Sequence, residues 1–199
     1  MELATRGSVC GLLHGSRRAE PLSLAMSAAM MYDVAKGMLY LHKLLPRVLH
    51  HDLKSLNLLL FDGLVVKICD FGLAKVKQSS MSSTTRAKGT AAWMPPECFE
   101  DEEVELWTRA SDVYSFGVVM YEFLARQLPW PKRKEAQIAL AVLKGLRPTL
   151  PDGCEPGVLR VLMERCWDQL PARRPTFDDV AIALRDAVAV LGGEIREGS

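Results

Sequence analysis

The sequence has almost no excess of charge of either sign. Its 199 residues include 25 Lys and Arg against 24 Asp and Glu, which gives a formal net charge of +1. Proteins that hold nucleic acid through bulk charge need a clustered basic excess, so we expect no nucleic-acid partner. Hydrophobic residues make up 49% and charged residues 25%, which excludes wholesale disorder and fits one globular domain.

Paired cysteines and long hydrophobic runs are also lacking. Five cysteines are scattered along the chain: Cys10, Cys69, Cys98, Cys154 and Cys166. They form no C-x-x-C pair and have no histidine at metal-ligand spacing, which indicates isolated thiols in a reducing compartment. The longest apolar stretch, residues 113–125, is interrupted by Ser115 and Glu122 and is too short to span a bilayer. With no legible signal peptide or lipidation motif, we expect a cytoplasmic protein with no membrane span.

Apolar residues at helical spacing are the main pattern in the sequence. Between Leu22 and Leu41 the apolar residues recur at steps of three and four, which predicts one amphipathic helix. Residues 112–125 are apolar almost all round, which is typical of a helix buried in the middle of a helical domain. Further amphipathic stretches cover about 133–144, 157–166 and 176–190.

Two short runs between these helices favour β-strands. Residues 58–61 and 64–68 are rich in Leu, Val and Ile, and the Asp62-Gly63 pair between them predicts a tight turn. We therefore expect a two-stranded element here. Residues 77–90 are rich in hydroxyl side chains without periodicity and predict a loop, and residues 192–199 predict a frayed tail.

Two polar segments flank the expected strand pair. Residues 50–57 read H-H-D-L-K-S-L-N and resemble the protein-kinase catalytic loop H-R-D-L-x-x-x-N. Residues 70–72 read D-F-G, which matches the metal-binding motif of the same family. Taken singly, such residues could be ordinary turn polars that cap helices and strands, so the resemblance depends on what else accompanies them.

Three further segments resemble protein kinases in the same order along the chain. Residues 89–97 are similar to the end of the activation segment, with Pro95 where the motif A-P-E has Ala. Residues 112–117 resemble the start of the central helix, and residues 166–176 resemble the closing helices. The resemblance implies that residues 1–199 form part of a kinase domain, the hinge and the C-terminal lobe. The implied fold is α+β, mainly α, with a short two-stranded β element.

The resemblance implies a catalytic role for several of the polar residues. Phosphoryl transfer needs positioned Mg²⁺, a carboxylate aimed at the attacking hydroxyl and electrostatic cover for the phosphoryl group. Asp52 would accept the proton of the substrate, and Lys54 would neutralise the transferred group. Asn57 and Asp70 would bind Mg²⁺ through the hard oxygen ligands that this ion prefers.

ATP is the implied second cofactor. Residues 1–8 resemble the kinase hinge, in which the backbone at Glu2 and Ala4 would bond to the adenine edge. Leu59 would line the floor beneath the adenine, and Asp70 would hold the metal that bridges the phosphates.

Two structural roles follow from the same resemblance. Glu97 would form a buried ion pair with Arg174, which would tie the activation segment to the last helices; two separate surface charges are the alternative. Asp112 would accept backbone hydrogen bonds from the catalytic loop, with simple helix capping as the alternative.

The implied substrate is a protein with a Ser or Thr hydroxyl. Lys54 and Thr90 resemble the pattern of Ser/Thr-specific kinases, and Trp93-Met94 with residues 166–177 resembles the tyrosine-kinase-like branch. The resemblance thus implies a serine/threonine kinase that transfers the γ-phosphoryl group of ATP.

Two departures from the family pattern leave alternatives open. His51 replaces the catalytic-loop Arg, and a His is only partly charged near neutral pH and makes no bidentate fork to a phosphate. Nothing resembles the Gly-rich loop or the V-A-I-K lysine, so we expect the N-terminal lobe to be absent from these 199 residues. A non-catalytic, pseudokinase-like binding module and an unrelated helical scaffold are the other hypotheses. The retained residues Asp52, Asn57 and Asp70 favour the catalytic lobe.

Overall fold

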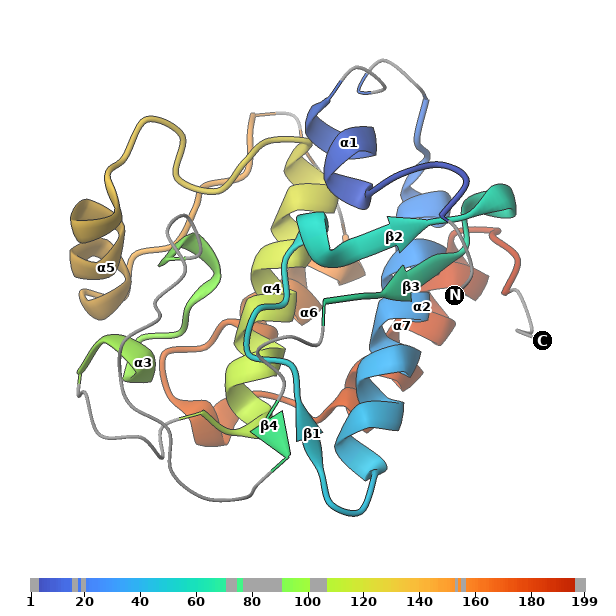
Figure 1. Cartoon of the computed structure of the whole chain (residues 1–199). Helices are drawn as coiled ribbons and strands as arrows, with labels where there is room; N and C mark the ends of the chain where they lie inside the picture. The colour runs from blue at the N-terminus through green and yellow to red at the C-terminus, as the bar shows by residue number, and fades with distance from the viewer. Residues whose placement is uncertain are drawn as a thin grey trace.

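The structure is a computed structural model that describes residues 4–15, 18, 21–70, 75–76, 91–100, 107–152, 154 and 157–195. In chain order its elements are α1 (Val9–His14), α2 (Leu24–Lys43), β1 (Val48–Leu49), η1 (Ser55–Asn57), β2 (Leu58–Leu60), η2 (Asp62–Leu64), β3 (Val66–Ile68), β4 (Lys75–Val76), η4 (Ala91–Trp93), α3 (Glu97–Glu100), α4 (Arg109–Ala125), α5 (Glu135–Leu143), α6 (Val158–Cys166), η5 (Pro171–Arg173) and α7 (Phe177–Val190), where η marks a 3-10 helix. The fold is mainly helical, as predicted, and contains small antiparallel strand pairs (Figure 1).

The helices expected from periodicity are all present, with ends within three residues of those predicted. The long helix predicted between residues 22 and 41 is α2, which begins after Ser23, whose hydroxyl accepts a hydrogen bond from the Met26 N–H at 3.1 Å. Within the described residues, no helix is long and apolar enough to cross a membrane.

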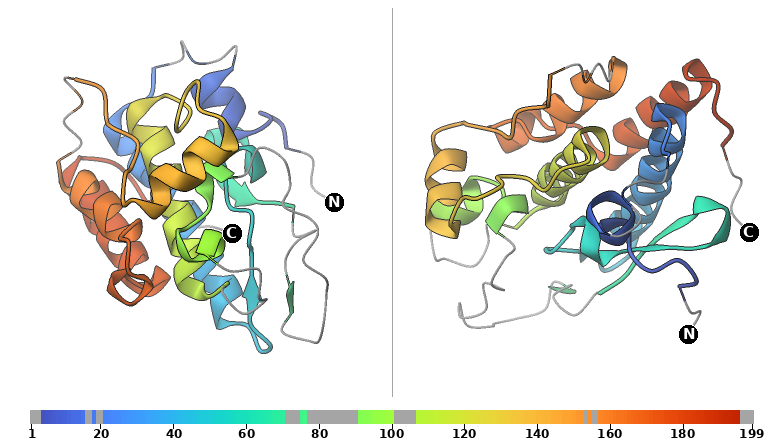
Figure 2. Two further views of the ribbon diagram at one scale, coloured as in Figure 1. Left: turned by 90° about the vertical axis from the view of Figure 1, so that its left-hand side faces the viewer. Right: turned by 90° about the horizontal axis from the view of Figure 1, so that it is seen from above.

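Helix α4 lies at the centre of the core. It is buried along nearly its whole length, as its all-round apolar sequence predicts, and it packs against α2, α6 and η4. Helices α2 and α7 run side by side next to it (Figure 2). Phe116 of α4 and Phe177 of α7 meet edge to face, with ring centroids 5.5 Å apart.

The predicted strand pair forms β2 and β3, which pair antiparallel with Leu58 opposite Ile68 and Leu60 opposite Val66. The chain turns between them through η2, where Gly63 has φ +70°, a left-handed conformation that suits glycine. The pair lies on α2 because Gly37 leaves room for it: a Cβ on Gly37 would lie 2.8 Å from Cδ1 of Ile68. The hairpin is thereby fixed against the helical core.

A second strand pair was not predicted. β1 pairs antiparallel with β4, with Val48 opposite Val76 and Leu49 opposite Lys75. The prediction of a single strand pair was therefore wrong. A strand of two residues is too short to show the alternation of apolar and polar side chains by which strands are recognised in a sequence. The predicted loop at 77–90 lies outside the described residues. α7 ends at Val190, and the predicted tail is described only as far as residue 195.

Candidate active site

The catalytic-loop residues predicted from the sequence lie together. Asp52 is buried, and its Oδ2 accepts from Lys54 Nζ at 2.7 Å and from Asn57 Nδ2 at 3.0 Å. Asn57 Nδ2 also donates to the Asp52 carbonyl oxygen at 2.8 Å. The short 3-10 turn η1 brings Asn57 back beside Asp52. The side chains of Lys54 and Asn57 thus both bond to Oδ2 of the Asp52 carboxylate.

The second carboxylate oxygen of Asp52, Oδ1, differs from Oδ2 in its hydrogen bonding. Asp52 Oδ1 is buried and has no hydrogen-bond partner within the part of the chain that the structure describes. Buried carboxylate oxygens normally have a partner, because an unpaired one costs free energy. A buried acceptor with an unfilled position is what a group needs if it is to receive a proton from a bound hydroxyl.

Asp112 anchors the backbone before Asp52. Its Oδ2 accepts from the His50 N–H and its Oδ1 from the His51 N–H, each at 3.0 Å, which confirms the role predicted for it. His42 Nε2 also lies 2.8 Å from Asp112 Oδ2. His51 has φ +67°, a strained conformation for a residue with a side chain, and these bonds hold it there.

Asp70 is returned toward Asn57 by the hairpin. The N–H of Cys69, the residue before Asp70, donates to the Asn57 carbonyl oxygen at 3.0 Å. The His50 ring links the same segments: its Nε2–H donates to the Cys69 carbonyl oxygen at 3.1 Å, and its Nδ1 accepts the Asp52 N–H at 3.3 Å. Asp70 itself is exposed and has φ +61°. Strained residues of this kind cluster at functional sites.

The residues predicted to contact adenine are described in part. Leu59 on β2 is partly exposed and forms an isolated β-bridge with Ser8. Arg6 N–H donates to the Leu60 carbonyl oxygen at 3.0 Å, so the segment after Ala4 runs along the edge of β2. Ala4 is partly buried. Glu2, like the Phe-Gly of the D-F-G motif and Thr90, lies outside the described residues.

The predicted ion pair between Glu97 and Arg174 is confirmed. Arg174 donates through Nη1 to Oε1 at 2.7 Å and through Nη2 to Oε2 at 2.8 Å, and its side chain is fully buried. Ser111 Oγ donates to Glu97 Oε1 at 3.1 Å. This two-pronged contact ties the start of α3 to the segment before α7.

Glu122 is a residue that sequence reasoning missed. It is fully buried on α4, and three segments bond to its carboxylate: Ser55 Oγ at 2.5 Å, Trp93 Nε1 at 2.8 Å and His14 Nε2 at 3.0 Å. It therefore links the catalytic loop, η4 and α1. The signal was present, because a glutamate inside an otherwise apolar helix needs partners where it is buried.

Asn57 and Asp70 fit a Mg²⁺ site in which phosphate oxygens supply further ligands. Among the described residues no group of three or more His, Cys, Asp or Glu side chains could hold a metal ion. Both hydrogen bonds of the Asn57 side chain use its nitrogen, so its amide oxygen remains for a metal. Mg²⁺ commonly binds through one or two protein oxygens plus substrate phosphates and waters, which Asn57 and Asp70 suit.

Comparisons with known proteins agree on one family. The family model described as protein tyrosine and serine/threonine kinase matches residues 1–184. The chain is 42% identical over 188 residues to the serine/threonine-protein kinase CTR1 of Arabidopsis thaliana, covering 94% of this chain and 22% of that protein. It is 39% identical over 187 residues to the dual specificity protein kinase shkC of Dictyostelium discoideum, covering 92% and 36%. With the Arabidopsis thaliana serine/threonine-protein kinase STY17 it shares 37% identity over 196 residues, covering 98% and 33%. The chain thus spans roughly a fifth to a third of the length of these relatives.

Proposed function

Because the chain belongs to the family of protein tyrosine and serine/threonine kinases, we propose that it is the hinge and C-terminal lobe of a serine/threonine kinase. Its reaction is the transfer of the γ-phosphoryl group of ATP to a Ser or Thr hydroxyl of a protein. The observation that carries this proposal is the Asp52 carboxylate, which is buried with one oxygen held by Lys54 and Asn57 and the other unfilled.

Asp52 positions and deprotonates the substrate hydroxyl. With Oδ2 occupied, the carboxylate cannot rotate freely, so Oδ1 is the atom that accepts the proton as the oxygen attacks phosphorus. Lys54 Nζ, 2.7 Å from Oδ2, places a positive charge beside the reacting groups, where it offsets charge on the phosphoryl oxygens.

The proposed nucleotide site uses the edge of the hairpin. Leu59 would contact the adenine, and the backbone at Glu2 and Ala4 would bond to its polar edge. Asn57 and Asp70 would hold Mg²⁺ by an amide and a carboxylate oxygen. Bound Mg²⁺ would neutralise the phosphates and orient the γ-phosphoryl group.

Ser/Thr specificity and location are supported by separate observations. Two of the relatives above are named serine/threonine kinases, and one is named a dual specificity kinase. All five cysteines are free thiols in the structure, which supports the cytoplasm as the compartment we propose.

The decisive experiment compares Asp52→Asn with Asp70→Asn in a chimera that joins the N-terminal lobe of an active kinase to this chain. We expect Asp52→Asn to lower kcat by about 10²- to 10⁴-fold with nucleotide affinity nearly unchanged, because a base acts on the hydroxyl only. Asp70→Asn should abolish Mg²⁺-dependent nucleotide binding in calorimetry, because it removes a metal ligand. Equal losses of nucleotide affinity in the two variants would contradict the assigned roles.

A further inference from the structure

We propose that a groove on α5 binds an acidic segment of the protein substrate through its carboxylates and an apolar side chain. This inference rests on the proposed kinase function and adds a docking site away from the catalytic loop. Its lining includes Lys132 and Arg133 of the basic run Lys132-Arg133-Lys134, which the site described above does not use.

The groove has an apolar floor. It is a hollow of about 480 Å³ lined by Pro131, Leu140 and Leu146, among others. The two leucines are 54% and 51% exposed, so about half of each side chain is open to a ligand. Their burial by a partner would gain free energy in proportion to the apolar area removed from water.

Basic side chains line this floor. Lys132, Arg133 and Lys144 contribute to the hollow, and none of the described residues that line it is an Asp or Glu. The chain as a whole holds 25 basic and 24 acidic residues, so this excess is local and does not reflect composition. Within the described residues none of the three forms an ion pair, whereas the buried cation Arg174 does. The groove is therefore complementary to negative charge.

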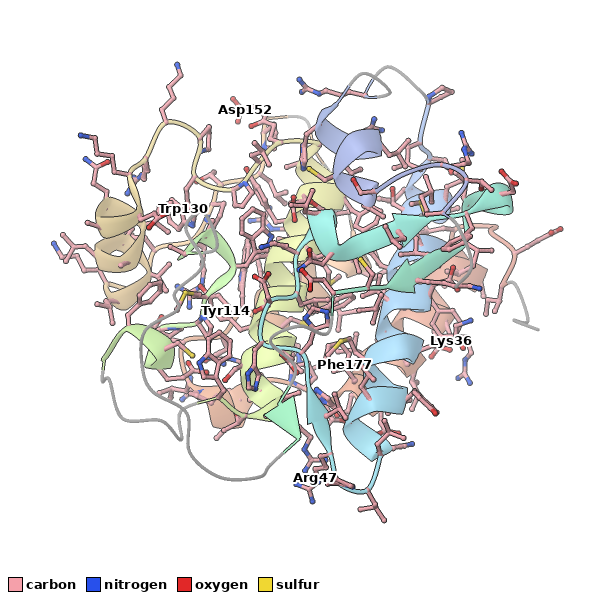
Figure 3. All side chains as sticks on the ribbon, in the orientation of Figure 1. Lys36, Arg47, Tyr114, Trp130, Asp152 and Phe177 are labelled. Atoms are coloured by element: carbon pink, nitrogen blue, oxygen red, sulfur yellow. The ribbon has the colours of Figure 1, made fainter. Side chains whose placement is uncertain are left out.

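The turn before α5 orients Arg133 and constrains the backbone at Lys132. Trp130, labelled in Figure 3, is buried. Arg133 lies over its ring with the guanidinium carbon 4.9 Å from the ring centroid, a cation–π contact. Trp130 and Lys132 have φ of +54° and +69°, a strained conformation for residues with side chains. The Arg133 N–H closes the turn by donating to the Trp130 carbonyl oxygen at 3.2 Å. The backbone of this turn and the position of the Arg133 side chain are thus set before a ligand binds.

A chain of contacts connects the groove to the catalytic loop. Helix α5 packs against η4, and Trp93 of η4 donates to Glu122, which also accepts from Ser55 of η1. A second hollow, of about 460 Å³, lies between η4 and α5 and shares Arg133 with the groove. A substrate whose acidic segment binds at α5 and whose linker reaches Asp52 would present its hydroxyl there at raised effective concentration. This favours a substrate segment as the occupant.

A peptide fits these features better than a membrane or a nucleic acid. The basic residues are few and stand around an apolar hollow, whereas binding to phosphate-rich surfaces needs a broad basic face. A segment in which leucines are separated by pairs of glutamates would pair its carboxylates with Lys132 and Lys144 and bury a leucine against Leu140.

The test is a binding titration by fluorescence anisotropy, with a labelled Glu-Glu-Leu-Glu-Glu-Leu peptide and no ATP. We expect the double variant Lys132→Glu, Lys144→Glu to weaken binding by about tenfold or more. The matched control is Arg165→Glu, Arg185→Glu, which makes the same charge change at exposed sites on α6 and α7 and should leave binding within about twofold of the original chain. Peptides with Gln for Glu, or Ser for Leu, should bind more weakly.

Three results would overturn the docking site: equal weakening by both double variants, no preference for the Glu peptide over the Gln peptide, or tighter binding to phosphatidylserine vesicles than to the peptide. Asp52→Asn should leave peptide binding unchanged, so failure of the kinase proposal and failure of the docking site are separable. In the active chimera, the groove variant should raise KM for a substrate that carries the acidic segment and leave kcat unchanged. A lowered kcat with unchanged KM would also contradict docking.

Discussion

The charged side chains around the catalytic loop differ from those around α5 in burial and in hydrogen bonding. Asp112, Glu122 and Arg174 are buried, and each has two or more hydrogen-bond partners. Lys132 and Lys144 are exposed and have no ion-pair partner within the described segments. A buried charge must be paired because its desolvation is costly, whereas an exposed charge is solvated and stays available to a ligand. The first region is therefore built for fixed geometry and the second for recognition.

The largest effect on stability should come from breaking the buried pair. Glu97→Ala leaves the buried guanidinium of Arg174 without its carboxylate, and we expect the free energy of unfolding to fall by about 3–5 kcal/mol in urea denaturation. The matched control is Glu164→Ala, which breaks an exposed pair with Arg160 on α6, whose side chains are 58% and 50% exposed. That change should cost far less, because an exposed ion pair is solvated and screened by salt. Similar losses of unfolding free energy in the two variants would show that burial does not determine how much an ion pair contributes to stability.

A smaller effect should follow from Glu122→Gln. The amide keeps the shape but replaces one acceptor oxygen by an NH2 donor. Trp93, which bonds to one oxygen, and Ser55 and His14, which bond to the other, therefore cannot all donate to it. We expect the free energy of unfolding to fall by about 1–3 kcal/mol.

A double-mutant cycle with Trp93→Phe identifies the contact responsible. Because Phe lacks the indole donor, the cost of Glu122→Gln should be smaller in the Trp93→Phe background. Strictly additive costs would contradict a direct role for this hydrogen bond.

The smallest effect concerns an exposed charge at the start of α7. Thr176 donates to Asp179 Oδ2 from its hydroxyl at 2.6 Å and from its backbone N–H at 2.9 Å, and these bonds lower the pKa of Asp179. A lowered pKa means that the stabilisation is present above the aspartate pKa of the unfolded chain, about 3.9, and is lost as the pH falls through the folded-state value.

Thr176→Val tests this contribution, because it removes the hydroxyl and keeps the backbone N–H. The hydroxyl also accepts the Asp179 N–H at 3.3 Å as the N-cap of α7, so only the part of the loss that involves the Asp179 carboxylate varies with pH. We expect a small loss of stability at pH 7 that diminishes below pH of about 3.9, measured as the difference in Tm between the two chains. Asp186→Asn, at an exposed site later on α7, serves as the control. A Tm difference that grows on acidification would contradict the assigned sign.

Periodicity predicted the helices because each buries one face, or in α4 every face, over many residues. The hairpin of β2 and β3 was predicted from its turn residues and β-branched side chains. The pairing of Val48 with Val76 was not predicted, because a two-residue strand forms only where a distant segment of the chain lies beside it. Asp52, Lys54 and Asn57 could be placed together from sequence because they lie within six residues of one another. Their assigned roles remain predictions that the variants above test.

The sequence by itself determined which chemical groups are available: a carboxylate, an ammonium and an amide in one short loop, and a basic run before α5. Only the tertiary structure decided that Asp52 Oδ1 is buried without a partner among the described residues, that Glu122 joins three segments, and that Lys132 and Lys144 line one hollow with exposed leucines. Local order along the chain fixes which residues are near neighbours. Burial and contacts between distant segments depend on how the helices pack, and packing is a property of the whole chain.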